Sequence, residues 1–272
     1  MGWMPQKIVG PVILATMMLA PFSCGHAQQG WLAVRTAGSL QTQSQKFKAE
    51  RAVGIGSTLQ MLFAMPKSLH VRVGVGYEYS WLRQKDVLDE WQWDYWEKTY
   101  IDFLPGAKAQ HVNQTLRYTS ADGIYLATFR PSQQLKELRL HIGLDHTLAL
   151  GQQLAFVGGC TFGADLFYRE LKMREDWTKR FNLDTTSVDL DYAFHYRLLH
   201  FAPTRTGVSY YVAPLAALRV TVSPSIDLDG EITYVHYFRR DRLLGIRLAE
   251  AGTKWLPLKG KVVAAIGVTF KY

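Results

Sequence analysis

Hydrophobic residues alternate with polar or small residues through most of the chain, at the two-residue period of β-strands. The clearest example ends the sequence. From Val262 to Tyr272 every second residue is apolar, and the other register carries Gly267, Thr269 and Lys271. A strand with one apolar face and one small or polar face, ending on an aromatic residue, is typical of a membrane β-barrel with a lipid-facing and a lumen-facing side.

Three strand–short turn–strand units show the same alternation, with turns at residues 64–68, 151–153 and 223–225. Many of these runs exceed the roughly 9–11 residues that a tilted strand needs to cross the hydrocarbon of a bilayer. The predicted strands are Val53–Phe63, Leu69–Trp81, Leu138–Leu150, Leu154–Tyr168, Val208–Val222 and Ile226–Phe238.

A first strand at Trp31–Gly38 and a last one at Lys259–Tyr272 bring the number to eight. The sequence therefore predicts an all-β fold, an antiparallel up-and-down transmembrane β-barrel with short periplasmic turns and long outer loops. Ten strands are the alternative, because Val188–Arg197 and the hairpin pattern at Thr115–Phe129 could extend above the membrane or join the barrel. The outer loops are predicted at residues 41–51, 87–134, 172–206 and 240–258.

The first 27 residues have the organisation of a secretory signal peptide: Lys7, an apolar run from Ile8 to Phe22, and the small residues Gly25 and Ala27 at the cleavage-determining positions. We expect residues 28–272 to form one outer-membrane β-barrel domain. Cys24 raises a lipoprotein alternative, although the residues before it fit a lipidation signal poorly. No later segment is long and apolar enough for a transmembrane helix.

Composition fits this location. Hydrophobic residues make up 48% of the chain and mean hydropathy is −0.08, as expected where apolar and polar faces cancel. The 14 Tyr and 8 Trp suit aromatic girdles at two membrane interfaces. After processing only Cys160 remains, which excludes an intrachain disulfide and suggests a small apolar strand residue.

The chain is basic, with a net charge of +8. In an exported protein we expect outer-membrane lipid and lipopolysaccharide to supply the opposite charge, and we expect no nucleic-acid partner. The predicted fourth outer loop concentrates cations that could neutralise lipopolysaccharide phosphates: Arg239, Arg240, Arg242, Arg247, Lys254 and Lys259.

The C-terminal pattern of Gly267, Phe270 and Tyr272 resembles that of the small eight-stranded outer-membrane β-barrel proteins common in Bacteroidota-type bacteria. The resemblance covers the mature chain as a rhythm of strands. It implies an outer-membrane location and recognition of this assembly signal by the barrel-assembly machinery, with no fixed activity. Ala265 departs from the polar residue usual at its position.

Charged residues recur in the predicted inward register. An eight-stranded barrel is just wide enough for its own side chains, and isolated charges there are costly, so four arginines and five acids should pair. We interpret them as a structural plug that closes the lumen, with an ion path or proton relay as the alternative. The predicted network is Arg72, Glu78, Arg139, Asp145, Asp165, Arg169, Arg219, Asp229 and Glu231.

Standard catalytic motifs are missing from the sequence: there is no His-Glu-x-x-His, no phosphate-binding loop and no Cys-x-x-Cys. We therefore predict no enzymatic activity, no cofactor and no metal site. A lipid-modifying hydrolase remains an alternative, since His146 and His236 fall in lipid-facing registers. His236 would lie near the outer interface.

The second outer loop is the best candidate for recognition. Its segment from Asp89 to Glu97 carries Trp91, Trp93, Tyr95 and Trp96 among four acids. Exposed Trp and Tyr are typical of binding hot spots, and a glycan or an envelope protein would be the partner. Alternatively, these rings belong to an interfacial girdle or cover the barrel mouth.

Together these observations predict a structural, adhesion or envelope-complex accessory protein of the outer membrane that acts through its outer loops. A narrow pore or uptake component is the second candidate and the hydrolase the third. A soluble periplasmic β-sandwich is the rival fold.

Overall fold

A computed structural model describes residues 30–44, 49–84, 87–102, 104–182, 191–238, 242–243, 246–247 and 255–272. The predicted signal peptide lies outside the described residues. So do Arg239, Arg240 and Lys254 of the basic loop and the side chains of Arg242 and Arg247, whereas Lys259 is described and exposed.

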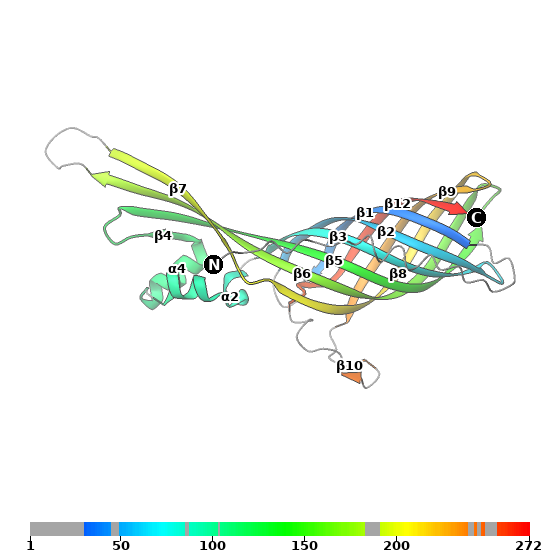
Figure 1. Ribbon diagram of the computed structural model, residues 1–272, viewed down its shortest axis with the longest axis horizontal. Helices are drawn as coiled ribbons and strands as arrows, with labels where there is room; N and C mark the ends of the chain where they lie inside the picture. Colours follow the sequence, from blue (N-terminus) through cyan, green and yellow to red (C-terminus); the bar gives the residue numbers. More distant parts are fainter. Residues whose placement is uncertain are drawn as a thin grey trace, which may run out of the picture.

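Eight long strands close into an antiparallel ring in which each strand pairs with its neighbours along the chain, and the last pairs with the first (Figure 1). This confirms the predicted up-and-down barrel. The ring consists of β1 (Gly30–Ser44), β2 (Ala49–Met65), β3 (Leu69–Gln84), β5 (Tyr125–Ala149), β6 (Leu154–Asn182), β8 (Arg205–Ser223), β9 (Ile226–Phe238) and β12 (Leu258–Lys271).

The two ends of the barrel differ. The turn end carries the short connections between β2 and β3, β5 and β6, and β8 and β9. The loop end carries the long connections, and from it β5 and β6, which are 25 and 29 residues long, project well beyond the ring. β4 (Arg117–Thr119) pairs with β5, and β7 (Asp191–Phe201) pairs with β6, in this projecting part.

The additional strands therefore lengthen the sheet above the barrel and do not enter the ring, so the ten-stranded alternative does not describe the barrel. We call residues 117–132, 170–182 and 191–201 the extension. Two short paired strands of two residues each, β10 (Arg242–Leu243) and β11 (Ile246–Arg247), lie in the fourth long connection.

The second long connection folds into short helices where the sequence predicted only a loop. These are α2 (Val87–Trp91), α3 (Asp94–Trp96), the π-helix η1 (Glu97–Ile101) and α4 (Gly106–Thr115). We call them the lid, because they lie against one side of the extension at the loop end (Figure 1). Among the described residues, no helix has both the length and the apolar character needed to cross a bilayer.

The outer surface of the ring is apolar. Ile266, Ile232 and Ile55 have exposed fractions of 77%, 62% and 58%, while their neighbours Ala265, Glu231 and Gly54 face the interior. The predicted outward and inward registers are thereby confirmed. A barrel that exposes this much aliphatic surface has the pattern of strands that contact lipid.

Candidate functional site

Small inward residues make room for long charged side chains. At Gly267, on β12, an added Cβ would lie 2.6 Å from the Val34 carbonyl oxygen and would overlap the side chain of Arg35 on β1. At Gly54 it would lie 2.7 Å from a carboxylate oxygen of Glu78. The glycines therefore alternate with large residues so that arginines can reach across the lumen.

Replacing Gly267 by alanine is expected to impair barrel closure, because the methyl group would push Arg35 and the β1 backbone away from β12. Overpacking of this kind costs about 1–3 kcal/mol. Refolding into lipid vesicles, followed by electrophoresis of heated and unheated samples, measures the folded fraction. Gly230→Ala is the matched control, since a Cβ there meets nothing within 4 Å. Equal folding of the two variants would contradict the steric argument.

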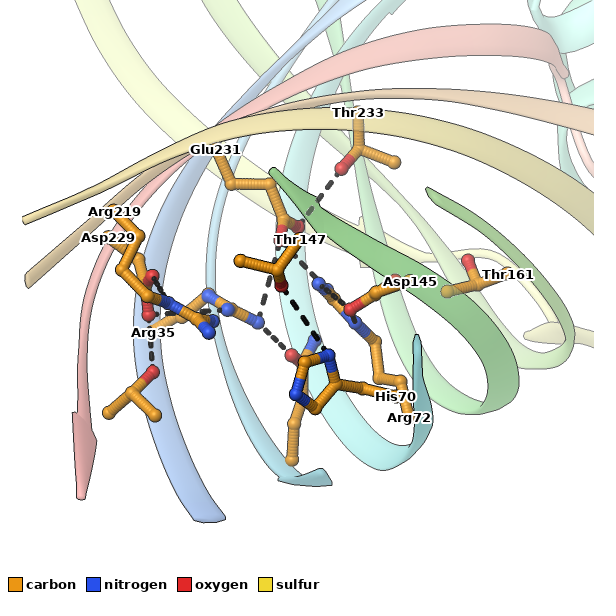
Figure 2. Close-up of polar contacts among 12 residues, drawn as sticks. Arg35, His70, Arg72, Asp145, Thr147, Thr161, Arg219, Asp229, Glu231 and Thr233 are labelled. Carbon is orange, nitrogen blue, oxygen red and sulfur yellow. Dashed lines mark hydrogen bonds and ion pairs between the residues drawn. The ribbon is translucent and has the colours of Figure 1, made fainter. Parts of the chain in front are cut away.

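At the turn end of the lumen, ion pairs connect β1, β3, β5, β8 and β9 (Figure 2). Arg72 donates from Nε to Asp145 Oδ2 at 2.8 Å and from Nη1 to Glu231 Oε2 at 2.8 Å. Arg35 lies between two acids, 3.5 Å from Glu231 Oε2 and 3.4 Å from Asp229 Oδ2. These side chains are almost fully buried, so each charge depends on its partners for stabilisation.

The same network continues toward the chain termini. Arg219 donates a hydrogen bond from Nε to Asp229 Oδ1 at 2.7 Å. Asp227 Oδ1 forms an ion pair with Lys271 Nζ at 2.7 Å. Thr269 also donates a hydrogen bond to Asp229. Four cations and four acids therefore meet at this end: Arg35, Arg72, Arg219 and Lys271 with Asp145, Asp227, Asp229 and Glu231.

A second network fills the middle of the lumen. Lys261 Nζ lies 2.9 Å from Glu78 Oε1 and 2.6 Å from Glu137 Oε2. Arg139 pairs with Glu78 and lies 3.6 Å from Asp165 Oδ2. The hydroxyl of Tyr237 donates toward Glu137 Oε1 (2.9 Å) and Asp165 Oδ2 (2.8 Å).

The sequence analysis missed five charged members of these networks: Arg35, Glu137, Asp227, Lys261 and Lys271. The inward orientation of these side chains could have been predicted from the alternation along each strand. Glu137 and Lys261 each precede an outward-facing apolar residue, Leu138 and Val262.

Among the described residues, the hydrogen-bond partners of Arg169 are two glutamines and a backbone carbonyl, and not the lumenal acid that the sequence analysis predicted. Nε donates to Gln133 Oε1 at 3.0 Å, Nη1 donates to the Trp255 carbonyl oxygen at 3.2 Å, and a further bond joins Arg169 to Gln84. Its guanidinium carbon lies 4.8 Å from the centre of a Trp91 ring. The reason is position, because Arg169 lies at the loop end, where the facing inward residues of β3 and β5 are glutamines.

Aromatic and cationic side chains close the mouth above Arg169. Trp91 Nε1 donates to the Pro203 carbonyl oxygen at 2.9 Å, and its own carbonyl oxygen accepts a bond from Arg205 at 2.7 Å. Arg205 also lies over the ring of Trp255 at 4.2 Å. Below this seal, the lumen retains a cavity of about 50 Å³, room for a few water molecules at most.

The lid buries the tryptophans that the sequence analysis expected to be exposed. Trp91, Trp93 and Trp96 have exposed fractions of 1%, 5% and 1%. The Trp96 ring packs 5.0 Å from Phe129, and the Tyr100 ring packs 4.7 Å from the same residue of β5. The expected exposure is therefore wrong, and Trp91 instead covers the barrel mouth, as the alternative interpretation had it.

A buried carboxylate joins the lid to the extension. Glu175 on β6 has no solvent exposure and accepts hydrogen bonds from Tyr100 Oη at 2.7 Å, Trp177 Nε1 at 2.9 Å and Tyr95 Oη at 3.2 Å. His200 Nε2, on β7, lies 3.4 Å from it. Burial, with the adjacent carboxylate, raises the pKa of Tyr100 and Tyr95, so both phenols keep their protons.

The histidines considered for a hydrolase lie among aromatic or apolar neighbours in the outward register. The ring of His236 lies 6.4 Å from that of Tyr234 and 6.1 Å from that of Phe238, within an aromatic band. His146 is exposed near the turn end, opposite Leu69. Within the described residues, no group of three His, Cys, Asp or Glu side chains has the arrangement of a metal site.

Comparison with known proteins adds distant structural likenesses only. No protein-family model and no curated protein sequence matches the chain. A major outer membrane protein from Thermus thermophilus is similar with 13% identity and a TM-score of 0.47, over 91% of this chain and 100% of that one. Neisserial surface protein A is similar with 10% identity and a TM-score of 0.38, over 89% and 97%.

The attachment invasion locus protein Ail of Yersinia pestis, in complex with the heparin analogue sucrose octasulfate, is similar with 10% identity and a TM-score of 0.37. That likeness covers 90% of this chain and 99% of the other. The architecture of the present chain is therefore best defined by its own strand pairing: an eight-stranded antiparallel β-barrel with a filled lumen, an extension and a lid.

Proposed function

We propose that this protein is a closed outer-membrane β-barrel that anchors its extension and lid at the cell surface, in a structural, adhesion or envelope-complex accessory role. The observation that carries the proposal is the contrast between the two parts of the molecule. Two ion-pair networks and the seal at Arg169 and Trp91 fill the barrel, while β5 and β6 continue far past it. A lumen filled in this way leaves no wide aqueous path, and the projecting strands present protein surface outside the membrane.

The outer-membrane location is supported by the aliphatic outer face of the ring and by the short turns at one end. Phe270 and Tyr272 face outward at the end of β12, with Gly267 inward, as an assembly signal for the barrel-assembly machinery requires. Outer-membrane lipid and lipopolysaccharide would surround the ring. Membership of the Bacteroidota-type family stays part of this proposal.

The proposal includes the absence of catalysis. His236 has aromatic neighbours and Glu175 is enclosed by its hydrogen-bond donors, so neither offers a substrate an open acid or base. The projecting extension and lid, and not the lumen, would meet a glycan or an envelope protein. The binding role predicted for Trp91, Trp93, Tyr95 and Trp96 would be indirect, through the shape of the lid.

Purified protein in planar lipid bilayers is expected to give no stable single-channel current, because buried ion pairs occupy the cross-section of the lumen at two levels. The measurement is the current at voltages up to the stability limit of the bilayer. A porin reconstituted in the same way is the control for detection. Large, stable openings of the unmodified chain would overturn the closed-lumen proposal and favour a pore or uptake component.

A further inference from the structure

The outward face of the barrel continues without interruption onto the extension. β5 and β6 pair in one register from Ala149 opposite Ala155 to Tyr125 opposite Lys179, with no bulge. Side chains on the even-numbered positions of both strands therefore face outward throughout. Near the apolar belt this face carries Lys136, whose Nζ lies 5.3 Å from the ring centre of Tyr168. Further along, the face becomes strongly cationic.

Three arginines surround one carboxylate on this face. Asp176 Oδ2 lies 3.3 Å from Arg130 Nε and 3.2 Å from Arg174 Nε, and Asp176 Oδ1 lies 2.8 Å from Arg197 Nε. The hydrogen bond from Arg197, with the nearby guanidinium charges, lowers the pKa of Asp176, so the carboxylate stays ionised. Three positive charges against one leave the group at a net +2. We call these four residues the arginine cluster.

Asp176 compensates the positive charge of the cluster only in part. Arg130 and Arg174 are directly opposite each other on paired strands, where like charges destabilise a sheet. The contact of each arginine with Asp176 is made by Nε and not by a terminal nitrogen. The side chains of Arg130 and Arg197 are 62% and 65% exposed. Guanidinium groups presented in this way bind phosphate through paired hydrogen bonds.

The surrounding residues of the same face reinforce the positive charge. Glu170 is the other acid on this face of β6, and it is shared between Lys136 (3.1 Å) and Lys172 (4.0 Å). Further exposed cations in the outward register are Arg117 on β4 and Arg180 on β6. The lid packs on the opposite face of the sheet, through Phe129 and Glu175, so it does not cover the arginine cluster.

We propose that the arginine cluster binds phosphate groups on the core sugars of lipopolysaccharide molecules that lie beside the barrel. The location favours this source. Arg130 lies six positions along β5 from Lys136, about 20 Å along the strand, which is beyond the lipid interface but on the side facing neighbouring lipids. The inference rests on the proposed outer-membrane location and adds a specific site and a ligand class to it.

The test is a titration of the full mature chain, folded in detergent, with purified phosphorylated core oligosaccharide, followed by calorimetry at low and high salt. The variant Arg130→Gln, Arg174→Gln, Arg197→Gln is expected to bind at least about tenfold more weakly and to lose most of the salt dependence. A control with the same charge change, Lys67→Gln, Lys98→Gln, Lys108→Gln, alters exposed lysines elsewhere and should bind within about twofold of the unmodified chain.

Asp176→Asn gives a test of sign. Removing the carboxylate raises the cluster to +3, so binding should tighten by about threefold even if the folded barrel becomes less stable. Weaker binding by this variant would contradict a site that attracts phosphate through its net positive charge, and the proposal would fail. Asp176→Asn also keeps the proposal testable if the triple arginine variant does not fold.

Two further probes separate the possible sources of anion. Core oligosaccharide stripped of its phosphates should bind weakly, and equal binding would overturn the proposal. Heparin binding more tightly than the phosphorylated core, with the same arginine dependence, would assign the site to a soluble polyanion and overturn the lipopolysaccharide source. If the unmodified chain forms a heat-modifiable, non-conducting barrel yet ignores every probe, only this inference fails. A chain that forms no such barrel would refute the proposed function itself.

Discussion

Replacing Trp91, Trp93 and Trp96 together by alanine is expected to release the lid from the extension while the eight-stranded ring stays folded. Each buried Trp→Ala change costs about 3–5 kcal/mol. The lid consists of helices of 3 to 10 residues, which are too short to persist in water without their packing surface. The ring is held by its own strand pairing, so it should survive the loss of the lid.

Limited proteolysis measures this effect. The triple variant should be cut rapidly between residues 87 and 115, whereas the protease-resistant barrel should still show the electrophoretic shift on heating. Trp81→Ala is the control, because Trp81 is 48% exposed on the outer face of β3 and makes no part of the lid. A lid that stays resistant in the triple variant, or a complete loss of the folded barrel, would contradict the separation of the two units.

The same experiment bears on recognition. If the triple variant loses binding to a glycan or an envelope protein, the loss will follow from the collapse of the lid, because the three indoles are buried. Direct contact with a partner would have to come from exposed lid residues such as Asp94 and Lys98, whose side chains are 82% and 73% exposed.

Alternation along the sequence was sufficient to predict the barrel. A strand places successive side chains on opposite faces, so the inward position of Arg72, Glu78 and Glu231 follows from the outward position of Val73, Tyr77 and Ile232. The turns were equally readable, since Ser223-Pro224-Ser225 interrupts two long runs of alternation.

Partners across the lumen could not be predicted in this way. Lys261 reaches Glu78 and Glu137, which are 183 and 124 residues away in the sequence. Which inward residues meet depends on the stagger of eight strands around the ring, and no single strand carries that information. Arg169 illustrates the limit. The alternation correctly predicted that its side chain points into the lumen, but it lies closer to the loop end than the charged networks, and its partners there are glutamines.

The lid was missed for a different reason. Val87, Leu88, Trp91, Trp96 and Tyr100 are spaced mostly by three to five residues, a signal closer to a helix than to a strand. That spacing could have predicted a short helical segment with one apolar face. Its destination could not be predicted, because Phe129 and Glu175 become a docking surface only once β5 and β6 pair beyond the barrel.

Replacing Arg72 by methionine should produce the largest loss of stability from a single substitution in the lumen. Arg72 is 1% exposed and bridges Asp145 and Glu231, each at 2.8 Å. Glu231 would keep its contact with Arg35, but the ion pair that stabilises Asp145 in the described structure would be lost. Leaving a buried charge without its partner costs about 3–5 kcal/mol. The urea concentration at half-unfolding in lipid vesicles measures the change.

A second substitution tests whether the cost is electrostatic. In the Arg72→Met background, Asp145→Asn removes the stranded charge and should recover more than half of the lost stability, since a neutral amide is far cheaper to bury. Lys98→Met breaks an exposed pair with Asp94 and should change stability by less than about 1 kcal/mol. If Asp145→Asn gives no recovery, the lost stability comes from packing of the arginine side chain. Side-chain packing would then stabilise the lumen more than ion pairing does.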